Sequence, residues 1–67
     1  MAVRKALLQA LEDKFNAEIS AADVALNIYL DHPVGIGEHP QFVEECDKLI
    51  AKIADAKDKL ETLKEFE

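Results

Sequence analysis

The residues best suited to chemistry lie in one short segment near the middle of the chain. Residues 31–40 contain the tripeptides Asp-His-Pro and Glu-His-Pro, separated by Val-Gly-Ile-Gly. Imidazole and carboxylate groups bind zinc and similar ions, so Asp31, His32, Glu38 and His39 are candidate metal ligands. A second interpretation is that the segment only connects two helices, since prolines and glycines are typical of such turns. We favour the connector, because histidines seven residues apart match no standard zinc spacing.

Zinc or nickel titration would separate these interpretations. A metal-dependent rise in melting temperature that is lost in His32→Ala and His39→Ala would indicate a metal site.

No arrangement typical of catalysis accompanies this segment. The single cysteine, Cys46, lacks an activating base at helical hydrogen-bonding distance, because His39 lies about two turns upstream. The Gly-Ile-Gly sequence lacks the preceding strand and the Lys-Ser/Thr pair of a phosphate-binding loop. We therefore expect no enzyme activity and no cofactor, and rank an enzyme assembled across a dimer interface last.

Composition narrows the classes of partner. The 67 residues carry a net charge of −6, which disfavours nucleic-acid binding, since that draws its affinity from Lys and Arg on phosphates. No apolar stretch approaches the roughly 20 residues that a membrane span needs. A lone cysteine is typical of a reducing compartment. The expected location is the cytoplasm, which for a viral protein is that of the host cell.

The elements that must position these residues are two helices. Residues 31–40 hold every Gly and Pro of the chain, and the flanking segments are rich in Ala, Leu, Glu and Lys. We predict one all-α domain over residues 1–67, with a helix over 2–30, a loop over 31–40 and a helix over 40–66. Matched lengths and a short connection favour an antiparallel two-helix hairpin.

Apolar spacing predicts which faces meet in the hairpin. In the second helix, apolar residues alternate at spacings of four and three, as in a coiled-coil heptad: Phe42, Cys46, Leu49, Ile53, Ala56, Leu60 and Leu63. The expected stripe of the first helix is Leu7, Leu8, Leu11, Phe15, Ile19, Ala22, Leu26 and Tyr29. Glu18 falls within this stripe, and Lys57 or another lysine across the interface is its expected partner, because a carboxylate buried alone is costly.

A second apolar strip on the first helix predicts self-association. This outer strip consists of Val3, Ala10, Ala17, Ala21, Val24 and Ile28. Together the stripe and the strip cover more than half of the helix circumference, which one partner helix cannot cover. We expect a homodimer that forms an antiparallel four-helix bundle with the first helices central. The alternative is that the alanines are simply exposed helix formers.

The loop also carries a resemblance. Residues 28–40, read as Ile-Tyr-Leu-Asp-His-Pro-Val-Gly-Ile-Gly-Glu-His-Pro and followed by an acidic amphipathic helix, resemble small proteins encoded by tailed bacteriophages and found in marine viral sequences. The resemblance covers most of the chain and implies a viral origin and a helical-hairpin shape, but no site residues. The expected function is that of an accessory protein acting through self-association and protein–protein contact. A metal- or ligand-binding hairpin is the alternative.

Overall fold

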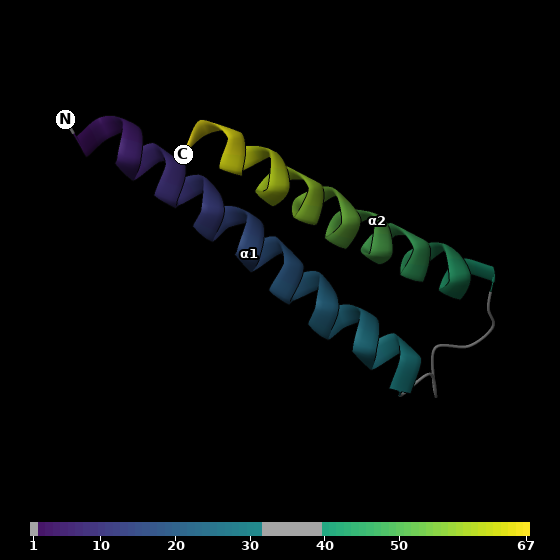
Figure 1. Cartoon of the computed structure of the whole chain (residues 1–67). Coiled ribbons are helices and arrows are strands. Elements are labelled where there is room, and N and C mark those ends of the chain that lie inside the picture. The colour runs from purple at the N-terminus through teal and green to yellow at the C-terminus, as the bar shows by residue number, and fades with distance from the viewer. Residues whose placement is uncertain (1, 32–39) are drawn as a thin grey trace.

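The protein is an antiparallel helical hairpin (Figure 1). The computed structural model describes residues 2–31 and 40–67. Helix α1 spans Ala2–Asp31, helix α2 spans Pro40–Leu63, and a 3-10 turn, η1, continues over Lys64–Phe66. The described residues contain no strand. The all-α hairpin predicted from the breakers and the periodicity is therefore confirmed.

The helix ends follow from local chemistry. Helix α1 ends at Asp31, one residue beyond the predicted Leu30 and shortly before Pro33. A proline disfavours helical angles in the residue before it, which limits extension of the helix. Pro40 is the first residue of α2, a position where the missing N–H of proline costs no helical hydrogen bond.

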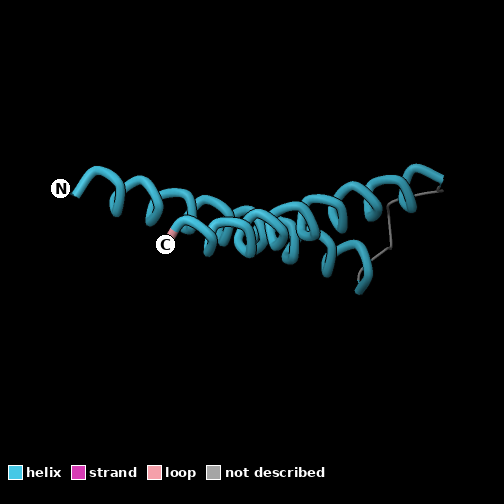
Figure 2. The backbone as a smooth tube through the Cα atoms, turned by 45° about the horizontal axis from the view of Figure 1, so that its top comes forward, coloured by secondary structure: helices cyan, strands magenta, loops and turns pink. Residues whose placement is uncertain are grey.

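The molecule is long and thin. Its extents are 53 × 15 × 13 Å and its radius of gyration is 15.6 Å, whereas a compact domain of this length would have a radius of about 11 Å. Figures 1 and 2 show that the start of α1 projects beyond the end of α2, and in the view of Figure 2 the helices cross near their middles. A hairpin of this shape has little interior.

The contact face of α2 is the predicted heptad seam. All seven predicted positions are buried or half-buried, with Ala56 and Leu63 the most enclosed. At the loop end the seam begins with Phe42, whose ring lies 5.3 Å from that of Tyr29 and is tilted by 50°. Offset and tilted ring pairs of this kind stabilise beyond the area they bury.

The contact face of α1 corrects part of the predicted stripe. Leu7 and Leu11 are 60% and 40% exposed, whereas Leu8 is half-buried. The alternating spacing of three and four that holds in α2, continued from Phe15 toward the N-terminus, leads to Glu12 and Leu8 instead. The face that meets α2 is therefore a second four-three seam, made of Leu8, Glu12, Phe15, Ile19, Ala22, Leu26 and Tyr29. Leu7 and Leu11 lie to one side of it because a residue advances about 100° around a helix.

The enclosed core is small. Among the described residues only Phe15, Ala22, Ala56 and Leu63 are buried, and no large side chain is fully enclosed. Two of these four are alanines, which bury little apolar area and so contribute little hydrophobic free energy. The hairpin alone is therefore a marginal fold, as expected for a chain of this size.

Candidate functional site

Exposed apolar side chains are concentrated on α1. Six of the nine large apolar side chains that are exposed in the described part of the chain belong to this helix. They are Val3, Leu7, Leu11, Val24, Ile28 and Leu30. Monomeric proteins seldom expose large contiguous apolar patches, and such patches mark interaction sites. The candidate site is therefore a surface of α1.

The outer strip lies on this surface. Val3, Val24 and Ile28 are 58%, 58% and 54% exposed, and the three alanines between them, Ala10, Ala17 and Ala21, are exposed as well. The contact with α2 thus leaves the whole strip uncovered. This is the condition that the predicted interface requires, and its use by a second copy remains a prediction.

An ion pair lies beside the outer strip. Lys14 Nζ donates to Glu18 Oε2 at 2.8 Å, across one turn of α1. The expected pairing of Glu18 with Lys57 is wrong, because its partner lies on its own helix. The side-chain hydrogen bond from Lys14, with help from the charges of Lys14 and Lys59, lowers the pKa of Glu18, although partial desolvation opposes the shift. Both side chains remain well exposed, so the pair contributes little to stability.

This pairing predicts a pH dependence. Because the folded-state pKa of Glu18 is lowered, its contribution is present above the ordinary pKa and is lost as the pH falls through the folded-state value. Lys14→Ala should raise the NMR titration midpoint of the Glu18 side-chain carboxyl. Lys57→Ala is the matched control and should leave it unchanged. An unchanged midpoint in Lys14→Ala would contradict the assigned pair.

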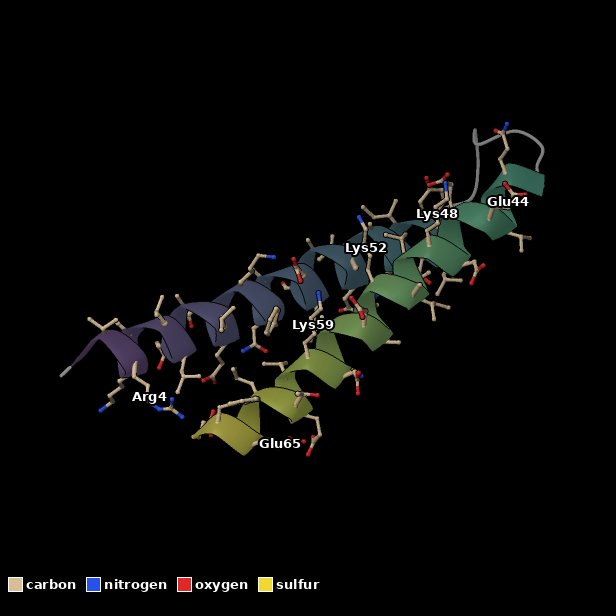
Figure 3. All side chains as sticks on the ribbon, turned by 90° about the horizontal axis from the view of Figure 1, so that it is seen from above. Arg4, Glu44, Lys48, Lys52, Lys59 and Glu65 are labelled. Carbon is tan, nitrogen blue, oxygen red and sulfur yellow. The ribbon has the colours of Figure 1, made fainter. Side chains whose placement is uncertain are left out.

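A groove of about 410 Å³ runs between the helices beside the outer strip. Its α1 wall consists of Glu18 and three alanines, and its α2 wall carries long charged side chains. In Figure 3, Lys52 and Lys59 extend from α2 toward α1. Lys59 Nζ lies 3.2 Å from Asp55 Oδ2 and 5.5 Å from the centre of the Phe15 ring. Among residues 2–31 and 40–67, those that line this groove include no serine, cysteine or histidine.

A second groove, of about 430 Å³, lies at the open end of the hairpin. Its floor is apolar, and it is lined by Arg4, Leu8, Leu11, Phe15, Lys59, Thr62, Leu63 and Phe66. The Arg4 guanidinium donates to the Phe66 carbonyl, which links the first turn of α1 to η1. Figure 3 shows the Arg4 side chain directed toward η1. Leu11 and Phe66, which are among the exposed apolar residues, line this groove, so it continues the exposed apolar surface.

Of the four candidate metal ligands, only Asp31 lies within the residues that the structure describes. His32, Glu38 and His39 lie outside the described residues, and Asp31 is exposed at the end of α1. No group of three His, Cys, Asp or Glu side chains within residues 2–31 and 40–67 is arranged to hold a metal ion. Cys46 is a free, half-buried thiol in the α2 seam.

Comparisons with known proteins identified no relative of this chain. No protein-family model, no curated protein and no solved structure matches the chain. Neither described helix combines the length and the apolar character that crossing a bilayer requires.

Proposed function

We propose that this hairpin is a non-enzymatic accessory protein, of the phage type that its loop resembles, which acts by self-association and protein–protein contact. The observation that supports this proposal most directly is the exposure of six large apolar side chains on one helix. A helix that is apolar around most of its circumference belongs inside a bundle. Self-association would give α1 that environment.

The exposed area is consistent with one such contact. The chain exposes 5171 Å², whereas a compact monomer of 7.5 kDa would expose about 4200 Å². The excess, about 970 Å² on that scale, is of the order of the roughly 800 Å² that each partner buries in a standard interface. A second hairpin covering α1 would therefore bring the exposed area per chain to that of an ordinary small protein.

Thermal unfolding at several protein concentrations tests this proposal. When folding is coupled to association, the melting temperature rises with protein concentration. We expect the melting temperature, measured by circular dichroism, to rise clearly between micromolar and hundred-micromolar chain concentrations. A melting temperature that is independent of concentration, in a chain that sediments as a monomer, would overturn the proposal.

A further inference from the structure

The exposure of Leu7 completes a regular pattern on the outer surface of α1. Adding Leu7 and Lys14 to the outer strip gives a seam with strict alternation of four and three, which we call the outer seam. Its members are Val3, Leu7, Ala10, Lys14, Ala17, Ala21, Val24 and Ile28. All eight are exposed, and none belongs to the face that meets α2. Helix α1 therefore carries two heptad seams, of which the hairpin occupies only one.

The outer seam has nearly the same order of side-chain sizes in both directions. Large apolar residues stand at its two ends, Val3 with Leu7 and Val24 with Ile28, while alanines occupy most of the centre. An antiparallel copy related by a two-fold axis makes each contact twice, residue i with j and j with i. This order then sets large residues against large ones at the ends and alanine against alanine nearer the centre. Three alanines at the centre also allow the two backbones to approach closely.

One register uses every position of the outer seam. In it, Val3 faces Ile28 of a second copy, Leu7 faces Val24, Ala10 faces Ala21 and Lys14 faces Ala17. A shift by one heptad in either direction would leave large apolar residues without partners at the ends. The register centred between residues 15 and 16 therefore buries the most apolar area.

Charges favour the antiparallel arrangement over the parallel one. Parallel copies would bring Lys14 against Lys14 in one layer, and would place Asp13 beside Glu18 of the other chain. In the antiparallel register Lys14 faces Ala17 of the other chain. Glu18 then lies beside Leu11 of that chain and Asp13 beside its Ser20, so neither carboxylate lies beside another. The Lys14 stem can then cover Ala17 while its ammonium group stays at the rim with Glu18 of its own helix.

We infer that two copies of this chain pair through the outer seams of α1, antiparallel and in the register that sets Ala10 against Ala21. The inference rests on the proposed self-association and specifies its geometry. The two α1 helices form the centre of a four-helix assembly and the two α2 helices lie outside. The Asp31 ends of the two α1 helices then point in opposite directions. They lie about 45 Å apart, because α1 is 30 residues long. The assembly would present the 31–40 segment twice, once at each end.

Disulfide cross-linking between separately prepared variants tests this geometry. All proteins carry Cys46→Ala, so that the introduced thiol is the only one. In a glutathione redox buffer, a mixture of Ala10→Cys and Ala21→Cys should form a mixed disulfide at least ten times faster than either variant forms one alone. A mixture of Ala17→Cys and Ala21→Cys is the matched control, because these positions would face each other only after a shift of one heptad. Circular dichroism confirms that each variant remains helical.

The possible outcomes separate this inference from the proposed function. Preferential self-cross-linking of Ala10→Cys and of Ala21→Cys would indicate parallel pairing and overturn the inference. Preferential reaction of the control mixture would overturn the register. A protein that sediments as a dimer but cross-links through none of these positions would also overturn the inference, because its interface would lie elsewhere. A monomer in sedimentation would overturn the proposed self-association itself.

Replacement of Lys14 provides a second test. A charged residue at one core position of a coiled coil weakens association while restricting register. Lys14→Leu should therefore lower the dimer dissociation constant by about tenfold or more, because each copy gains a buried apolar side chain. Lys5→Leu, on the polar arc of α1, is the matched control and should leave it nearly unchanged. A weaker dimer in Lys14→Leu would contradict the placement of this residue in the seam.

Discussion

Replacing Ala21 and Val24 together by glutamate is expected to dissociate the assembly while leaving the hairpin helical. Both residues lie in the exposed outer strip, and symmetry places each substitution in the interface twice. The four new carboxylates would be desolvated without partners, at a cost of several kcal/mol in total. The dissociation constant should rise at least about 100-fold, which corresponds to roughly 2.7 kcal/mol.

A matched control adds the same charge elsewhere on α1. Gln9→Glu with Asn16→Glu also introduces two carboxylates, at exposed positions on the polar arc. This variant should associate as the parent does, apart from a small effect of its larger net charge. Analytical ultracentrifugation of both variants over a concentration series measures the difference. Equal weakening in the two variants would show that net charge, rather than the outer strip, governs association.

Phe15→Ala is expected to produce the largest loss of stability from a single substitution. Phe15 is the largest of the four buried residues and is only 9% exposed. The Nζ atoms of Lys14 and Lys59 lie 5.9 and 5.5 Å from the centre of its ring. Truncating a buried phenylalanine costs about 3–5 kcal/mol, and the cation–π contacts would be lost as well. Since the core is small, a cost of about 3 kcal/mol would unfold much of the population.

Urea unfolding at a fixed protein concentration measures this loss. Phe66→Ala is the matched control, because it makes the same chemical change at a side chain that is 52% exposed. Its cost should stay below about 1 kcal/mol, since about half of the residue's surface is already in contact with water. Similar losses in both variants would contradict the assignment of Phe15 as the main packing residue between α1 and α2.

Much of this fold could be predicted because the helix-breaking residues are confined to one segment. The two breaker-free segments on either side of residues 31–40 predicted both helices, and Asp31 and Pro40 lie within one residue of the expected ends. Helix α2 itself ends at Leu63, three residues before the expected 66. The α2 seam was predicted at every position, since its apolar residues have a single consistent phase. Its buried end, Leu63, is followed by only a short 3-10 turn.

The contact face of α1 could not be fixed from spacing in the same way. Apolar residues cover more than half of this helix, so several stripes fit its periodicity equally well. Leu7 and Leu8 differ by only one position, and only packing against α2 shows that Leu8 faces inward. The partner of Glu18 was also missed, because Lys14, one turn away on the same helix, forms the ion pair with this carboxylate.

The candidate site was partly predictable for the same reason. An excess of apolar residues on α1 indicated an outer strip, and its six positions are exposed. Leu7 and Lys14 were not included in it, since one was assigned to the inner stripe and the other is charged. The metal interpretation concerns His32, Glu38 and His39, which lie outside the described residues and stay a sequence-based hypothesis.

Sedimentation equilibrium of the unmodified protein measures whether a second copy covers α1. If α1 is covered by a second copy, the molecular mass at micromolar concentrations should be twice the chain mass of 7.5 kDa. The mass should fall toward that of one chain only on strong dilution. A folded, helical species with the mass of a single chain throughout this range would contradict self-association, because the apolar face of α1 would then be stable in contact with water.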